Sequence, residues 1–380
     1  MVSLTAEINA RRNCSGAPPS PAEAYQTVGV AGRLPVFYEQ LKSKLNFPMS
    51  WTSGNYHDFR EWQKAARQKV LDLLLPAPGD IPFQPQIVAE QDRGHYVARK
   101  VAFNLTAESR VLGLTLIPKG LGPFPALLLL HDHGAKFDIG KEKVIEPWDD
   151  PEKLAAAQAW TAKYFDGHFI GDRLAARGYA VLAVDALGWG DRGGMEYPDQ
   201  QGLASNLSHL GTTLAGLMAH EDRRAAAFLA TFPEVDPRAI GACGFSMGAY
   251  RAWQVAALSD TIKAAVAVCW MATLKGLMVP GNNQTLGHSA FHMVHPGLAN
   301  FLDYPDIASI AAPKPLLFYN GALDPLFPAD SVQEAYAKLR RIWDSQDAAA
   351  NLETRLWPAL EHVFNEAEQD AAFAWLERHL

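Results

Sequence analysis

Cysteine is scarce in this sequence, with only Cys14, Cys243 and Cys269 among 380 residues. Cys243 and Cys269 lie in apolar, strand-like segments, where a free cysteine behaves as a small hydrophobic residue. The spacing of the three fits neither a disulfide framework nor a familiar metal site. The segment Gly188-Trp189-Gly190 is too short to form a dinucleotide fingerprint. We therefore expect no disulfide, no metal and no other cofactor.

Long apolar runs and clusters of basic residues are also missing. The longest purely aliphatic run covers residues 126–130, which is far too short to cross a bilayer. The first ten residues are polar and mixed, unlike a secretory signal. The net charge is −7 and no run of Lys or Arg occurs, which argues against a nucleic-acid partner. These absences predict a cytoplasmic protein that binds neither membranes nor nucleic acids.

What the sequence does contain is enough apolar material for a large core, with 48% hydrophobic and 20% charged residues. From residue 97 onward, short apolar segments alternate with segments of helical spacing. This alternation predicts an α/β fold with a mainly parallel sheet of about eight strands and helices on both faces. The predicted strands are 97–103, 111–117, 126–130, 180–184, 240–245, 264–269, 316–319 and 352–357. The predicted helices are 56–75, 165–177, 208–231, 250–258, 331–343 and 366–379.

Two regions depart from this alternation. Residues 1–90 contain no run of buried strands, and we expect a mostly helical extension packed on the core. Residues 271–312 are rich in glycine and proline and hold three histidines. This stretch follows the sixth predicted strand and is expected to form a cap-like insert within the main domain, residues 91–380.

One segment carries a specific chemical signal. Gly244, Ser246 and Gly248 form a Gly-x-Ser-x-Gly sequence between a predicted strand and a predicted helix. A serine in this setting sits on a sharp turn that exposes its Oγ above the sheet, and the next backbone N–H, that of Met247, faces a developing oxyanion. The alternative is a glycine-rich turn whose serine has no function.

A nucleophilic serine needs a base, and the base needs an orienting acid. In folds with this turn the chain order is serine, acid, histidine. Asp324 follows the predicted strand 316–319 and His362 follows the strand 352–357. Both would therefore lie at the carboxyl edge of the sheet, where α/β proteins place their sites. Taken singly, Asp324 could be a turn former before a proline and His362 a surface histidine.

The loop after the strand 126–130 reads His131-Asp132-His133-Gly134-Ala135. A His-Gly-x stretch at this place supplies a second oxyanion donor in hydrolases of this architecture. We favour the backbone N–H of His133, with Gly134 or Ala135 as alternatives. The rival interpretation is a metal site, because His131, Asp132 and His133 are all possible ligands. The His-x-His pair on a strand end can bind zinc, although nothing nearby supplies a third ligand at a familiar spacing.

These residues together resemble the α/β-hydrolase superfamily. Within it, the chain is most similar to the dienelactone-hydrolase-related and acetyl-xylan-esterase-like bacterial group, over roughly residues 90–380. Trp51 and Trp62 in the helical lead-in resemble the N-terminal extension of that esterase-like group. The resemblance rests on the segments 130–134, 184–192, 244–248 and 320–324 and on His362.

The resemblance implies an α/β-hydrolase fold with Ser246 as nucleophile, His362 as base and Asp324 as orienting acid. Dienelactone hydrolases proper resemble one another in using Cys as nucleophile, so the serine here puts the dienelactone substrate in doubt. The insert 271–312 is also longer than a minimal member needs.

The function expected from the sequence is hydrolysis of a small-molecule carboxylic ester, with a small acyl group, through an acyl-enzyme. The alternatives are a hydrolase that cleaves a C–C bond of a diketone and a non-catalytic binding protein that kept the fold. Asp185 and Arg192 are expected to pair and fix their loop. The N-terminal aromatics would suit either intramolecular packing or a homodimer contact. Candidate substrate contacts are Trp189, Trp270 and Phe327, with His288, His292 and His295 of the insert.

Overall fold

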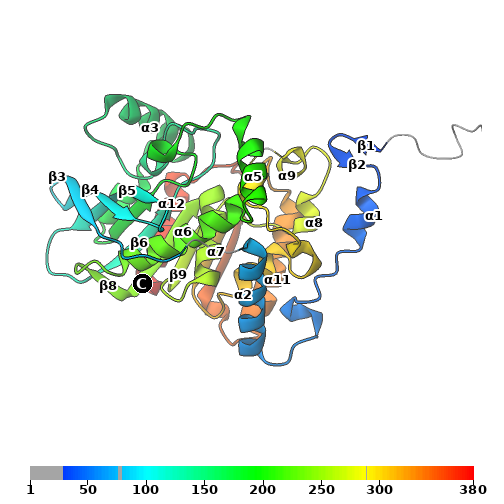
Figure 1. Cartoon of the computed structure of the whole chain (residues 1–380). Coiled ribbons are helices and arrows are strands. Elements are labelled where there is room, and N and C mark those ends of the chain that lie inside the picture. The colour runs from blue at the N-terminus through cyan, green and yellow to red at the C-terminus, as the bar shows by residue number, and fades with distance from the viewer. Residues whose placement is uncertain (1–28, 76–78, 288) are drawn as a thin grey trace, which may run out of the picture.

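The computed structural model describes residues 29–75, 79–287 and 289–380, and its centre is a nine-stranded sheet (Figure 1). The strand order is β11-β10-β9-β8-β6-β7-β5-β4-β3. β3, β4 and β5 form antiparallel pairs, and β5 also pairs antiparallel with β7, whereas the remaining neighbours are parallel. The bounds are β3 Gln86–Asp92, β4 Tyr96–Asn104, β5 Arg110–Pro118, β6 Phe124–Leu130, β7 Ala180–Val184, β8 Val235–Phe245, β9 Ala264–Val268, β10 Leu316–Gly321 and β11 Leu352–Trp357.

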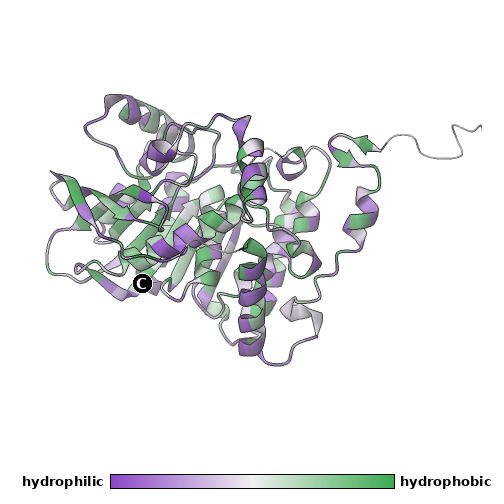
Figure 2. Cartoon of the chain, in the orientation of Figure 1, coloured by the Kyte–Doolittle hydropathy of each residue, from purple (hydrophilic) through white to green (hydrophobic). Residues whose placement is uncertain are grey.

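The inner strands are buried on both faces because helices cover the sheet from both sides. In β6, Leu127 and Leu129 belong to one core while Leu128 and Leu130 belong to the other, as the two-residue period of a strand requires. Figure 2 shows these inner strands as mainly hydrophobic, whereas α2 (Phe59–Leu74) alternates hydrophobic and hydrophilic residues around its axis.

One face packs against α2, α6 (Leu214–Leu229), α7 (Met247–Leu258), α10 (Tyr304–Ser309) and α11 (Ala329–Asp344). The other face packs against α3 (Pro151–Tyr164), α4 (Ile170–Ala175) and α12 (Glu366–His379). The predicted α/β-hydrolase fold with helices on both faces is confirmed. The predicted number of strands omitted β3, whose residues are almost all exposed because β3 forms the edge of the sheet.

The N-terminal segment adds to the first face. Trp62 of α2 is fully buried and its Nε1 donates to the carbonyl of Met49 at 2.7 Å. The short strands β1 (Val30–Ala31) and β2 (Leu34–Pro35) and the helix α1 (Tyr38–Ser43) lie beside the insert (Figure 1). Arg33 donates to the carbonyl of Leu286 at 2.8 Å, and Lys42 to that of Met278 at 3.0 Å.

The insert between β9 and β10 consists of short helical pieces joined by turns. They are α8 (Leu274–Leu277), α9 (Asn283–Leu286), the 3₁₀ turns η5 (Ala290–His292) and η6 (Leu298–Asn300), and α10. None of the helices in the described part of the chain is both long and apolar enough to cross a membrane.

Two predicted helices differ from the observed ones. The segment 208–231 divides into α5 (Asp199–His209) and α6, because Gly211 has φ of +80° and Thr213 caps the second helix by accepting from Gly216. The helix predicted over 165–177 is reduced to α4, since Asp166 and Gly167 have positive φ. The preceding α3 was not predicted, although Asp150 caps it and Pro151 opens it.

Candidate active site

Ser246 occupies a strained turn between β8 and α7, with φ of 57° and ψ of −126°. A β-carbon on Gly244 would lie 2.1 Å from the carbonyl oxygen of Gly248, and one on Gly248 would lie 1.8 Å from that of Leu130. Both positions therefore require glycine. The same contacts press the first turn of α7 against the end of β6, and Met247 lines one cavity together with His133 of the loop that follows β6.

Asp324 and His362 converge on Ser246. The Oγ of Ser246 lies 2.9 Å from Nε2 of His362, and Nδ1 of His362 lies 2.6 Å from Oδ2 of Asp324. The other carboxylate oxygen of Asp324 accepts the backbone N–H of Leu326 at 2.9 Å. The Asp324 side chain is fully buried, whereas that of His362 remains 15% exposed. The three side chains that the sequence singled out thus form one continuous hydrogen-bonded chain.

Backbone contacts hold the two loops together. The N–H of Ala322 donates to the carbonyl of Trp357 at 2.8 Å, and that of Leu323 donates to Leu360 at 2.9 Å. A β-carbon on Gly321 would lie 2.3 Å from the carbonyl oxygens of Leu360 and Glu361. This close approach of backbone to backbone fixes the distance between the acid and the imidazole.

The loop after β6 faces the same place. His133 lines both cavities that open onto Ser246. Its ring lies between two partners, because Nδ1 accepts the N–H of Ala135 at 3.0 Å and Nε2 is 2.5 Å from Oε1 of Gln200. Burial lowers the pKa of His133 to about 4, so the imidazole is neutral and donates from Nε2. The Ala135 amide is thereby occupied, which leaves His133 and Gly134 as the loop's candidate oxyanion donors.

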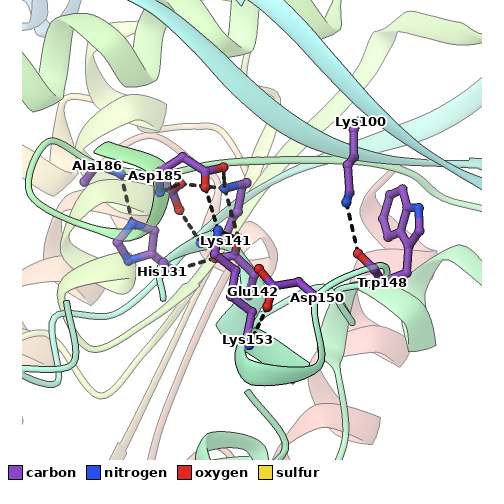
Figure 3. A network of polar contacts seen from close by, with 11 residues as sticks. Lys100, His131, Lys141, Glu142, Trp148, Asp150, Lys153, Asp185 and Ala186 are labelled. Atoms are coloured by element: carbon purple, nitrogen blue, oxygen red, sulfur yellow. Dashed lines mark hydrogen bonds and ion pairs between the residues drawn. The ribbon is translucent and has the colours of Figure 1, made fainter. Parts of the chain in front are cut away.

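The side chains of the rival metal site bind different neighbours. Nε2 of His131 accepts the N–H of Ala186 at 2.9 Å, a contact visible in Figure 3. A carboxylate oxygen of Asp132 accepts a hydrogen bond from the Nε1–H of Trp160 at 3.0 Å, and the His133 ring is hydrogen-bonded to Gln200. Within the described residues these three side chains do not converge as a ligand set.

A partly buried ionic network lies next to this loop (Figure 3). Lys141, which is 1% exposed, pairs with Asp185 and Asp191 at 2.6 Å each, and Lys153 joins Asp191 to Glu142. The carboxylates of Glu142, Asp185 and Asp191 lie close enough together to suggest a cation site, but the two ammonium groups already pair with them.

The predicted pairing of Asp185 with Arg192 is therefore wrong in detail. Arg192 forms a bidentate pair with Glu221, at 2.7 Å for each contact, and reaches only the backbone carbonyl of Asp185. Asp185 pairs with Lys141 instead, because the lysine from the loop after β6 is the cation buried beside it.

Two cavities meet at Ser246. The outer one has about 180 Å³ and combines aromatic with polar groups, whereas the inner one has only about 20 Å³. The outer cavity is lined by Asp132, His133, Gly134, Ala135, Trp160, Tyr164, Tyr197, Phe245, Ser246, Asn283, Ser289, Leu326 and His362. The inner cavity is lined by His133, Ser246, Met247, Trp270, Asn282, Asn283, Gln284, Ser289, Met293, Leu326 and Phe327.

Of the predicted substrate contacts, Trp270 and Phe327 line the inner cavity. The Phe327 ring also stacks on the imidazole of His362, with the centroids 6.2 Å apart. Trp189 does not fit this role, because it is fully buried behind His133 and its Nε1 donates to the His133 carbonyl at 3.1 Å. His292 and His295 are buried in the insert, and His288 lies outside the described residues.

Several residues at the site carried no signal in the sequence. Trp160 and Tyr164 come from α3 and Gln200 from α5, two helices that the sequence did not predict at these bounds. Asn283 and Ser289 come from the insert, whose fold has no periodic pattern. For Asn283 and Ser289, the sequence offered only their place in a polar, turn-rich stretch around residues 282–289.

Comparison with known proteins agrees with this architecture. The chain is 30% identical over 291 residues, covering 75% of this chain and 90% of the other, to the protein named "Putative hydrolase YtaP" of Bacillus subtilis (strain 168). A structure from Bacteroides fragilis NCTC 9343, titled a "putative acetyl xylan esterase", has a TM-score of 0.69 at 16% identity and covers 90% of this chain and 94% of its own.

A glucuronoyl esterase from Solibacter usitatus has a TM-score of 0.63 at 14% identity and covers 89% of this chain and 99% of its own. At such low identities the two structures show a shared fold. Residues 156–376 match the model of the dienelactone hydrolase family, over more than half of the chain. The chain therefore belongs to the dienelactone hydrolase family.

Proposed function

We propose that the protein is a serine hydrolase that cleaves short-chain carboxylic esters through an acyl-enzyme. The observation that carries the proposal is the hydrogen-bonded chain from Ser246 Oγ through His362 to Asp324, which opens onto both cavities. In this assignment His362 accepts the Ser246 proton while Oγ attacks the ester carbonyl. Asp324 keeps the imidazole in the tautomer that presents Nε2 to the serine.

The oxyanion that forms is stabilised by two backbone amides. Met247 supplies the first N–H of α7, which helix geometry leaves without an intrahelical acceptor. The loop after β6 supplies the second, which we assign to His133. His362 then protonates the leaving alcohol, and a water activated by the same imidazole releases the acid.

The size of the inner cavity is an argument for a substrate with a small acyl group. A space of about 20 Å³ is close to that of one water-sized group, so it accommodates a methyl group and excludes longer chains. The outer cavity supports a polar alcohol, because Trp160 and Tyr164 offer aromatic faces beside the amide of Asn283. Acetylated carbohydrates combine both features, and the Bacteroides fragilis structure titled a "putative acetyl xylan esterase" fits this substrate class.

The test combines two variants with a chain-length series. Ser246→Ala is expected to lower p-nitrophenyl acetate hydrolysis by at least about 10³-fold, since the nucleophile is lost. The wild type is expected to lose about 10-fold or more in kcat/KM from acetate to butyrate. Met293→Ala, which enlarges the inner cavity, is expected to reduce that loss.

Substantial ester turnover by Ser246→Ala would overturn the assignment of the nucleophile. Equal kcat/KM values for p-nitrophenyl acetate and p-nitrophenyl butyrate would overturn only the proposed preference for a small acyl group. A parallel panel of β-diketones checks the alternative reaction, because a C–C hydrolase would turn these over faster than any ester in the panel.

A further inference from the structure

Lys143 is a buried cation directly behind the loop that follows β6. It ends the 3₁₀ turn η3 (Lys141–Lys143) and is 0% exposed. Its Nζ donates to the backbone carbonyl of Asp132 at 3.1 Å and to that of His133 at 3.0 Å. A carboxylate oxygen of Asp132 lies 3.4 Å away, and the face of Trp160 covers the ammonium at 4.7 Å from the ring centroid.

Burial lowers the pKa of the Lys143 ammonium group, and the Asp132 carboxylate opposes that shift. The set of partners around Nζ fits the charged form of the side chain. Three oxygen acceptors surround Nζ, which matches the three N–H donors of an ammonium group, whereas a neutral amine has only two. The Asp132 carboxylate and the Trp160 face offset part of the cost of burying the charge. The two carbonyls, at 3.0 and 3.1 Å, are closer to Nζ than the carboxylate is.

The two carbonyls belong to the peptide groups that supply the candidate oxyanion donors. The carbonyl of Asp132 shares a planar trans peptide with the N–H of His133, and the carbonyl of His133 shares one with the N–H of Gly134. In a trans peptide the N–H points opposite to the C=O. Lys143 therefore holds both peptides from behind, whichever of the two amides faces the oxyanion.

Each of these carbonyls has a second donor. His131 Nε2 accepts the N–H of Ala186, so Nδ1 carries the proton and donates to the carbonyl of Asp132 at 2.8 Å. Trp189 Nε1 donates to the carbonyl of His133 at 3.1 Å. Donors on a carbonyl polarise the peptide and strengthen its N–H as a hydrogen-bond donor. The fixed orientation also removes the need for reorganisation when the oxyanion forms.

We propose that Lys143 is a positioning residue for the oxyanion site, and that its charge strengthens the loop amide that binds the transition state. This inference rests on the proposed ester hydrolysis at Ser246. Lys143 itself touches neither substrate nor Ser246 in this arrangement. Its effect should therefore appear in transition-state stabilisation and leave ground-state binding of the ester nearly unchanged.

The experiment compares Lys143→Met with Lys100→Met. Lys100 makes the same two kinds of contact, donating to the carbonyl of Trp148 at 2.9 Å and lying 4.8 Å from the centroid of that ring (Figure 3). Within the described residues, Lys100 makes no hydrogen bond or ring contact with residues 131–135, so it controls for loss of a lysine that binds a carbonyl and an indole. The measurements are kcat and KM for p-nitrophenyl acetate and Ki for a trifluoromethyl ketone, whose adduct with serine carries an oxyanion.

Lys143→Met is expected to lower kcat by about 10-fold to 100-fold, less than the 10²–10³-fold of losing a direct oxyanion donor. KM should stay within about 2-fold of the wild-type value. Ki should rise by the same factor by which kcat falls. Active sites are counted with a fluorophosphonate, so that a merely structural defect lowers the number of sites and leaves kcat per site unchanged. Lys100→Met should keep the wild-type kcat and Ki.

Lys143→Gln covers the case in which the methionine variant fails to fold, because it keeps a neutral hydrogen-bond donor at this buried position. Lys143→Gln should also lower kcat and raise Ki. Wild-type kcat per site and wild-type Ki in a folded Lys143 variant would overturn the inference. That result is distinct from failure of the proposed function, in which Ser246→Ala would itself retain ester turnover.

Discussion

At the scale of single residues, the serine turn depends on backbone contacts that leave no room for a side chain. Gly248 brings α7 within contact of the Leu130 carbonyl, and Gly244 lies against Gly248 itself. The strained φ of Ser246 persists because β8 and α7 hold it from both sides. The glycines therefore set the position of the Oγ as much as the serine does.

Replacing Gly248 by alanine is expected to cost about 3 kcal/mol or more in the free energy of unfolding, because the new β-carbon meets a backbone oxygen at 1.8 Å. Gly202→Ala in α5 is the matched control. Its β-carbon meets nothing within 4 Å, and alanine should stabilise that helix by about 0.5–1 kcal/mol. Urea unfolding of both variants measures the difference, and similar effects at the two sites would contradict the packing argument.

At the scale of elements, α12 begins at a buried carboxyl group behind the active site. Asn365 and Glu368 form a capping box, in which one carboxylate oxygen of Glu368 accepts the Asn365 N–H at 3.1 Å. The other oxygen has no hydrogen-bond partner among the described residues. Burial raises the pKa of Glu368 from 4.5 to about 8, so the folded protein holds this proton at neutral pH.

This pKa shift predicts a pH-dependent stability with a definite sign. Between pH 4.5 and 8 the folded state binds more protons than the unfolded state at Glu368, so stability falls as pH rises through this range. Glu368→Gln, which is neutral throughout and can keep the cap, should gain about 1–3 kcal/mol at pH 8 and little at pH 5. Urea unfolding at both pH values tests this.

Glu366→Gln serves as the control for that experiment. Glu366 stands in the same first turn of α12, but its side chain is 56% exposed. Its substitution should change stability by less than about 0.5 kcal/mol at either pH. An equal gain for Glu368→Gln at pH 5 and pH 8 would show that proton uptake at this carboxyl is not the cause.

At the scale of the whole molecule, the helix α2 of the N-terminal extension is part of the hydrophobic core. Trp62, Ala66 and Val70 of α2 are fully buried in the core that also contains α6, α7 and α10. Gln63 donates to the carbonyl of Ala312 at 2.8 Å, which ties α2 to the end of the insert. Unfolding of α2 should therefore be cooperative with unfolding of the sheet.

Trp62→Ala is expected to destabilise the protein by about 3–5 kcal/mol, because a fully buried indole leaves a cavity. Trp51→Ala should cost clearly less, since Trp51 is only half-buried and binds Ser345 Oγ at the surface. The far-ultraviolet signal and ester hydrolysis should be lost in a single transition for both variants. Separate transitions would show that the N-terminal segment unfolds independently of the sheet.

The sequence by itself determined the local elements wherever one pattern dominated. β7, β11 and α12 have the predicted bounds, because a short apolar run between turn residues, or a capped periodic helix, has few alternatives. The order of Ser246, Asp324 and His362, which follow β8, β10 and β11, was also readable, since parallel strands bring their carboxyl ends to one edge. The three side chains come into contact because all of them lie at that edge of the sheet.

Only the tertiary structure decided what surrounds them. Lys143, Trp189 and Gln200 contact His133 in the loop after β6, and they come from η3, the loop after β7 and α5. No local pattern links these segments, because their contacts depend on how distant parts of the chain pack. The insert follows the same principle, since its short helices are set by contacts with α1, α6 and α11. Local periodicity fixes which segments form strands and helices, whereas the shape and charge of the site arise where those segments meet.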